Sequence, residues 1–114
     1  MDKERIREVF FYKNYYLEFY NTLDKKVQLK FNWTLELIEQ EIRVPEKYFK
    51  HLTDTNGLYE IRVEFRRNAY RVFCFFDEGA LIILINGFQK KKRKTPKREI
   101  ELAQKLKKEY YSEK

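Results

Sequence analysis

The sequence predicts an α+β fold in which an antiparallel sheet of three to four strands packs against N-terminal helices and is followed by a C-terminal helix. Three observations favour this class. Apolar residues recur at helical spacing up to Pro45, alternate from Leu58 onward, and return to helical spacing after Pro96. At 114 residues the chain has the length of a single domain, which we expect to span 1–114.

The first 45 residues predict a short strand and two helices. Val9–Tyr12 is a β-type run, and Asn14 can cap a helix that ends near Leu23. Asp24 can cap the second helix, and Pro45 stands beyond its end. Its inner stripe has spacings of three and four and comprises Val27, Phe31, Leu35, Ile38 and Ile42. A second stripe, Leu29, Trp33 and Leu37, predicts that this helix contacts another helix as well as the sheet.

Period-two alternation predicts three strands, at Leu58–Phe65, Tyr70–Phe76 and Leu81–Phe88. A two-residue loop at Arg67-Asn68 would place Glu64 opposite Arg71, and a loop at Glu78-Gly79 would place Arg71 opposite Asn86. The core face would then hold Ile61, Val63, Phe65, Tyr70, Val72, Cys74, Phe76, Leu81, Ile83 and Ile85. The reverse face would hold Glu60, Arg62, Glu64, Arg71, Phe73, Phe75 and Asn86.

The C-terminal segment predicts a helix from Pro96 to about Tyr111. Thr95 can cap this helix, and proline suits its first turn. The expected inner stripe is Ile100, Ala103, Leu106 and Tyr110.

Positive charge is concentrated at the C-terminal end. Residues 90–114 hold 11 of the 25 Lys and Arg but only 4 of the 18 Asp and Glu, so the net charge of +7 lies there. The densest part is the run Lys90–Arg98. Neutralising the phosphates of a polyanion releases condensed counterions, so nucleic acid is the expected partner.

Arg62 and Arg71 on the reverse face, flanked by aromatic rings, indicate a surface for phosphate and bases. An ordinary cross-strand ion pair between Glu64 and Arg71 is the alternative interpretation, and the pattern does not separate the two.

Other chemistries find little support. Cys74 is the only cysteine, which excludes an intramolecular disulfide, and we expect an inert buried thiol. His51 stands alone, and no zinc ligand set, Ser/His/Asp set or glycine-rich phosphate loop is present. We expect no metal or other cofactor. No segment approaches the roughly 18–20 apolar residues of a membrane span, so we expect a cytoplasmic protein without a membrane partner.

Several segments together resemble the HigB-like, phage-derived branch of the RelE/ParE toxin superfamily. They are Leu58-Tyr59-Glu60-Ile61-Arg62, Tyr70-Arg71-Val72-Phe73, Gly87-Phe88-Gln89-Lys90-Lys91 and Lys94-Thr95-Pro96 with Glu99, Ile100 and Ala103. The likeness is close over about residues 45–110. It implies a RelE-like fold and a type II toxin that cuts mRNA in the ribosomal A site without a metal. The implied partners are a cognate antitoxin, the ribosome and mRNA.

The resemblance also implies roles for individual residues. Arg62 and Arg71 would hold the scissile phosphate and stabilise its developing charge. Lys90, Lys91 and Lys94 would bind RNA or protonate the leaving oxygen, and Phe88 would stack on a base.

The general acid and base stay open at the level of sequence. Asn86 stands where relatives often have histidine, which removes an imidazole acid. Glu60 or Glu64 could serve as acid or base, although an exposed glutamate with a pKa of roughly 4.3 is a weak base. The alternative from another class is a non-catalytic protein that inhibits a target such as DNA gyrase or binds RNA without cutting it.

Overall fold

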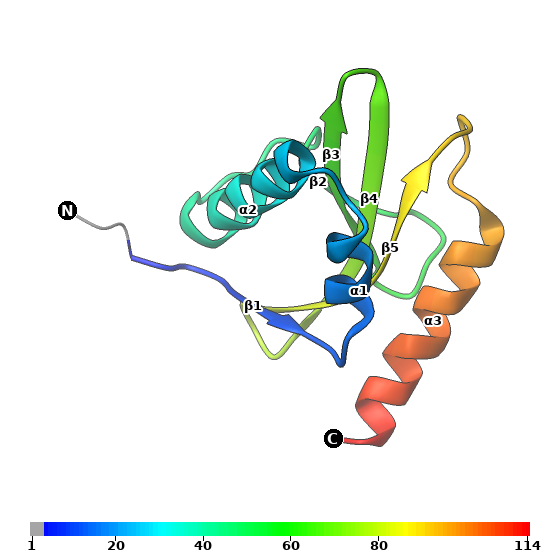
Figure 1. Ribbon diagram of the computed structural model, residues 1–114. Helices are drawn as coiled ribbons and strands as arrows, with labels where there is room; N and C mark the ends of the chain where they lie inside the picture. The colour runs from blue at the N-terminus through cyan, green and yellow to red at the C-terminus, as the bar shows by residue number, and fades with distance from the viewer. Residues whose placement is uncertain (1–3) are drawn as a thin grey trace.

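The computed structural model describes residues 4–114 as three helices and a five-stranded sheet (Figure 1). The elements in chain order are β1 (Glu8–Phe11), α1 (Tyr15–Asn21), α2 (Lys25–Gln40), β2 (Phe49–His51), β3 (Tyr59–Phe65), β4 (Asn68–Asp77), β5 (Leu81–Lys90) and α3 (Lys97–Ser112). The α+β class and the C-terminal helix are confirmed. Within residues 4–114, no helix is long and apolar enough to cross a membrane.

The sheet is mixed and has the strand order β1-β5-β4-β3-β2. β1 runs parallel to β5, whereas the other neighbours are antiparallel. The sequence predicted three to four antiparallel strands. The structure differs in two ways, because it contains the three-residue strand β2 and because β1 pairs with β5 in parallel. A run as short as Phe49–His51 is too brief to show alternation, and the pairing of β1 with β5 joins distant parts of the chain.

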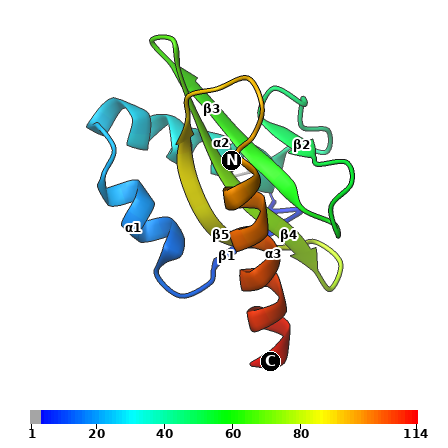
Figure 2. The ribbon, with the colours of Figure 1, turned by 90° about the vertical axis from the view of Figure 1, so that its right-hand side faces the viewer.

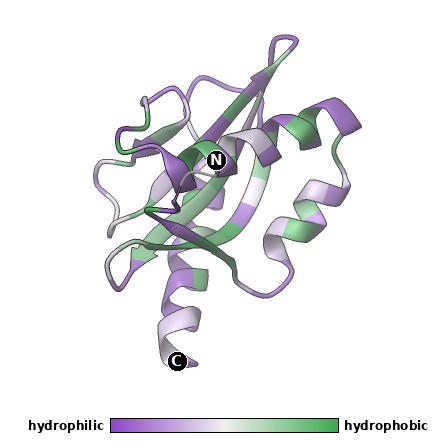
Figure 3. Cartoon of the chain, turned by 90° about the vertical axis from the view of Figure 1, so that its left-hand side faces the viewer, coloured by the Kyte–Doolittle hydropathy of each residue, from purple (hydrophilic) through white to green (hydrophobic). Residues whose placement is uncertain are grey.

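Helices α1 and α2 cover one face of the sheet, and α3 crosses the other face (Figure 2). The core beneath α1 and α2 contains Tyr16, Val27, Phe31, Leu35, Ile38, Ile61, Val63, Tyr70, Val72, Cys74, Ile82 and Leu84. The core beneath α3 contains Tyr12, Leu58, Phe73, Phe75, Ile83, Ile85, Phe88, Ala103 and Leu106. Hydropathy follows this layering, because the strands are mainly hydrophobic while the helices alternate along their length (Figure 3).

Helix α2 contacts a second helix as expected, but the contact lies on its inner stripe, where Phe31 packs against Tyr16 and Phe19 of α1. In the outer stripe, Leu29 is 53% exposed and Trp33 is 49% exposed, and the Trp33 ring packs against Tyr48, which lies outside the helices. Ile42 lies beyond the end of α2 and is also exposed. The Arg7 guanidinium donates hydrogen bonds to carbonyls at this end, including those of Ile38 and Glu41, and so satisfies groups that the ending helix leaves free.

The turn between β4 and β5 changes which residues face which core. It contains three residues, 78–80, because Asp77 pairs with Leu81. The sequence predicted a two-residue loop, which would have placed Leu81, Ile83 and Ile85 on the face of α1 and α2. A slip of one residue reverses a strand, so that assignment is wrong and these residues face α3.

An irregularity in β5 then alters the alternation. The register shifts between Val72 and Cys74, so the residues that follow Ile85 change sides. Asn86 and Phe88 therefore lie on the α3 side, as the Asn86 contact with Glu99 shows. Gly87 instead faces α1, where a Cβ atom would lie 2.4 Å from the Phe19 ring.

The β3–β4 hairpin turns at Arg66-Arg67, whose positive φ angles of 49° and 68° suit a tight turn. The predicted loop at Arg67-Asn68 was wrong, and every partner shifts by two residues. Arg62 consequently pairs with Arg71, and Glu64 pairs with Ala69. An even shift preserves the faces, so Arg62, Glu64 and Arg71 stay on the α3 side as predicted.

Candidate functional site

Arg62 and Arg71 are direct cross-strand neighbours on the α3 side of the sheet. Like charges in this position repel each other. Glu60 offsets the repulsion, because its Oε1 lies 3.6 Å from Arg62 Nε and 3.8 Å from Arg71 Nε. The three side chains carry a net charge of about +1 at neutral pH. This cluster of Glu60, Arg62 and Arg71 is called the arginine pair site below.

Glu60 is held firmly within the arginine pair site. It is 2% exposed, and Thr95 Oγ1 donates a hydrogen bond of 3.0 Å to its Oε2. Thr95 was predicted to cap α3, but the N-cap position is Pro96, and Thr95 instead ties the basic segment to the sheet. Both oxygens of Glu60 are therefore engaged, which suits a residue that positions the two arginines better than one that accepts a proton.

The guanidinium of Arg71 is buried and only partly satisfied. Its side chain is 4% exposed, and Nη1 donates to the Tyr70 carbonyl at 3.0 Å. Arg71 Nε is buried and has no hydrogen-bond partner within residues 4–114. Burial, together with the nearby Arg62 charge, lowers the Arg71 pKa. A guanidinium has five N–H donors, so this buried fork has capacity for an anion.

Arg62 is the more accessible member of the pair, with a side chain that is 24% exposed. Its Nη1 donates to the Glu46 carbonyl at 3.3 Å, while its buried Nε has no hydrogen bond to any part of the chain that the structure describes. Buried donors without partners are uncommon in proteins. Here both Nε atoms lie within ion-pair range of the same Glu60 oxygen but beyond hydrogen-bond distance.

Lys90 lies at the end of β5, opposite Ala69, on the same side as the arginine pair site. Burial and the neighbouring Arg71 charge lower the Lys90 pKa. A lower pKa makes the ammonium a better proton donor. Lys91 and Lys94 follow in the segment that joins β5 to α3, where both are exposed.

Phe88 pairs with Arg71 across β4 and β5, but its ring belongs to the core beneath α3. It is 8% exposed, and its centroid lies 5.4 Å from that of Phe73. The resemblance implies that Phe88 stacks on a base, but its ring is buried in packing contacts and has no exposed face for a base.

Glu64 and Asn86 complete the set of residues singled out from the sequence. Glu64 is exposed, and residues 4–114 offer it no salt bridge, so the ion pair with Arg71 that was the alternative interpretation does not form. Asn86 donates to Glu99 Oε1 at 3.3 Å and to the Glu99 carbonyl at 3.2 Å. Asn86 therefore fixes the first turn of α3 beside the site.

The remaining candidates lie apart from this chemistry. Cys74 is buried, and burial raises the pKa of its thiol. His51 packs edge-on against Tyr59. Within the described residues, no group of three or more His, Cys, Asp or Glu side chains is placed to hold a metal ion. Sequence reasoning missed Thr95 as a contact of Glu60, since its position before Pro96 has the ordinary signature of a helix cap.

A family model described as Phage derived protein Gp49-like (DUF891) matches residues 18–108. The matched segment contains the arginine pair site, Glu64, Lys90, Lys91 and Lys94. No curated protein matches the chain.

Proposed function

Because the chain belongs to the Gp49-like family of phage-derived proteins, which is related to RelE- and HigB-like toxins, we propose that it is a type II toxin that cleaves mRNA on the ribosome. The observation that carries the proposal is the arginine pair site, where two facing guanidiniums each keep a buried Nε without a hydrogen bond. The two guanidiniums carry one more positive charge than Glu60 balances, and an RNA phosphate would neutralise it.

The proposed reaction uses the 2′-hydroxyl of the mRNA as the nucleophile. A bond forms from the 2′-oxygen to phosphorus while the bond to the 5′-oxygen of the next nucleotide breaks. Arg62 and Arg71 bind the non-bridging oxygens and stabilise the charge that develops on them. The chemistry also moves two protons, one from the 2′-hydroxyl and one to the departing 5′-oxygen.

Among the residues of the site, Lys90 is the best-supported proton donor, because its pKa is lowered and it lies beside the arginine pair. Glu64 is the proton acceptor in this proposal, since its exposed carboxylate has no ion pair among residues 4–114, whereas both oxygens of Glu60 are engaged. Lys91 and Lys94 bind the RNA backbone as exposed point charges. An antitoxin that neutralises the protein is the partner that this function requires.

A non-catalytic inhibitor is the second candidate, and one observation favours it. The Arg71 side chain is 4% exposed and already bonds the Tyr70 carbonyl, as a structural arginine would. In that case the protein would block a target such as DNA gyrase, or bind RNA without cutting it, through the basic run Lys90–Arg98.

Pulse labelling after induced expression separates the two candidates. An mRNA-cleaving toxin should reduce methionine incorporation before thymidine or uridine incorporation. Primer extension on the same samples should show new 5′ ends within translated regions, and an Arg71→Lys variant should show neither effect. An earlier fall in thymidine incorporation would favour the gyrase-type inhibitor.

A further inference from the structure

The outer edge of β3 is open beyond its short contact with β2. β2 pairs only with Tyr59–Ile61, and the Arg62 N–H then donates to the Tyr48 carbonyl at 2.8 Å. Backbone groups alternate in direction along an antiparallel strand, so those of Glu64 also point away from β4. The Glu64 carbonyl accepts a hydrogen bond of 2.6 Å from Lys30 Nζ, which confirms that direction.

Two backbone groups on this edge have no partner in the part of the chain that the structure describes. They are the carbonyl of Arg62 and the N–H of Glu64. An unpaired donor and acceptor on a sheet edge are the groups with which an added strand pairs. Lys30 covers only the Glu64 carbonyl, as lysines that discourage edge pairing commonly do, and leaves the neighbouring groups free.

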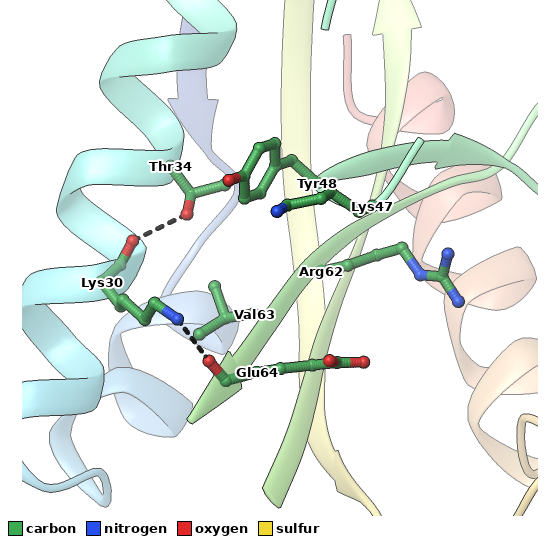
Figure 4. Close-up of a pocket in the computed structure, with 7 residues that line it drawn as sticks. All are labelled: Lys30, Thr34, Lys47, Tyr48, Arg62, Val63 and Glu64. Atoms are coloured by element: carbon green, nitrogen blue, oxygen red, sulfur yellow. Dashed lines mark hydrogen bonds between the residues drawn. The ribbon is translucent and has the colours of Figure 1, made fainter. Parts of the chain in front are cut away.

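A pocket of about 250 Å³ opens between this edge and α2 (Figure 4). It is lined by Lys30 and Thr34 from α2, by Lys47 and Tyr48, and by Arg62, Val63 and Glu64. In Figure 4, Lys30 and Lys47 extend toward the pocket, whereas the Arg62 guanidinium points away from α2. A side chain of an added strand could therefore enter the pocket from the edge of β3.

The charge around the edge selects the kind of strand. Lys30 and Lys47 line the pocket, and a second hollow continues past Glu64 to Arg66 and Arg67 at the hairpin. Among the described residues that line the two hollows, Glu64 alone is acidic. Acidic side chains fit this surface, and an extended peptide also supplies backbone N–H and C=O groups at strand spacing, which RNA lacks.

We propose that the β3 edge from Arg62 to Phe65 binds an extended acidic segment of a protein partner, which adds to the sheet as a further strand. Alternate side chains of that segment lie on opposite faces. One set meets Lys30 and Lys47, and the other lies on the side of Arg62. If the protein acts as proposed above, a partner bound here also brings carboxylates to the arginine pair site and competes with RNA.

The test uses the full chain and a blocked seven-residue peptide of alternating glutamate and valine as the probe. Titration of the ¹⁵N-labelled protein should shift the amide resonances of residues 62–66 and slow the exchange of the Glu64 N–H. N-methylation at every second residue removes the N–H donors along one edge of the peptide. Two such peptides exist, methylated at the odd or at the even residues, and the one that loses the donors facing β3 should bind far more weakly. A peptide with lysine in place of glutamate should not bind.

Charge reversal gives the matched comparison. The double variant Lys30→Glu/Lys47→Glu should bind the acidic peptide on the order of tenfold more weakly. Lys26→Glu, an exposed change on the same helix, should leave the affinity unchanged. If the amide spectrum shows that the double variant is unfolded, Lys47→Glu alone should still weaken binding.

Three results would overturn the proposal. The first is that the peptide shifts only the amide resonances of Lys90–Arg98. The second is that both N-methylated peptides bind as tightly as the parent peptide. The third is that an RNA oligonucleotide shifts the resonances of residues 62–66 more strongly than the peptide does. None of these measurements depends on cleavage. A protein that cuts mRNA but binds no peptide would refute only the edge proposal.

Discussion

Arg62 and Arg71 face each other across β3 and β4, and a single oxygen of Glu60 lies 3.6 Å from one Nε and 3.8 Å from the other. One carboxylate thus holds two guanidiniums that would otherwise repel. The cluster keeps a net charge of about +1, and neither Nε has a hydrogen bond among residues 4–114. The predictions below follow from this arrangement and from the packing that supports it.

Replacing Glu60 with glutamine should destabilise the protein by about 3 kcal/mol. The change removes a carboxylate that lies within ion-pair distance of both arginines, while the amide keeps an acceptor for Thr95. Arg62 retains some access to water, so we expect the lower end of the range for a broken buried ion pair. Urea unfolding measures the loss.

Glu64→Gln is the matched control for Glu60→Gln, because Glu64 is exposed and pairs across the sheet with Ala69. It should change stability by less than about 0.5 kcal/mol. Equal losses in the two variants would show that Glu60 does not hold the arginine pair.

Gly87→Ala should destabilise the protein by about 1–3 kcal/mol, because the added Cβ would lie 2.4 Å from a ring carbon of Phe19. A double-mutant cycle with Phe19→Leu checks the cause. The smaller side chain should reduce the cost of the added methyl group in thermal unfolding. A cost that does not change in the Phe19→Leu background would mean that the clash is not with this ring.

The C-terminal end of α3 should weaken as the pH falls. The Tyr110 hydroxyl and Lys114 lower the Asp77 pKa, while Lys13 and Tyr12 lower the pKa of Glu109 and of Glu113. A carboxyl whose pKa is lowered by folding stabilises the fold fully at a pH above its ordinary pKa, which is 3.8 for Asp and 4.5 for Glu. It loses that contribution as the pH falls through the lowered pKa.

Thermal unfolding of the wild type and of Asp77→Asn between about pH 7 and pH 3 measures this effect. The variant should melt earlier at neutral pH, and the difference should shrink on acidification. A difference that stays constant over the whole range would contradict the assigned role of the Asp77 charge.

The helices were predictable from sequence because their inner stripes are long and regular. Ala103 and Leu106 are buried beneath α3, and Val27, Phe31 and Ile38 are buried beneath α2, as expected. The outer stripe of α2 misled only the choice of face, since α1 packs on Phe31 of the inner stripe while Leu29 and Trp33 are about half exposed. Periodicity shows which residues share a face of a helix, but not whether that face is covered.

Strand register was predicted less well than the helices, because a turn that is one residue longer or shorter changes the pairing of every residue in the strand. The displaced turn at Arg66-Arg67 kept the faces, and the three-residue turn at 78–80 reversed them for Ile83 and Ile85. Arg62 and Arg71 were predicted on the correct face, yet their direct pairing and the shared Glu60 were not. The Thr95 contact with Glu60 joins residues 35 positions apart, and no local pattern indicates it.

The most direct test of the account is the rate at which Arg71→Lys cleaves ribosome-bound mRNA, compared with Arg67→Lys in the exposed β3–β4 turn. Lysine keeps the charge but loses the planar fork that binds two phosphate oxygens. We predict that Arg71→Lys keeps its fold and ribosome binding and cleaves about 10²–10³-fold more slowly, while Arg67→Lys cleaves at the wild-type rate. Cleavage by Arg71→Lys at the wild-type rate would show that Arg71 is structural and that the arginine pair site is not the active site.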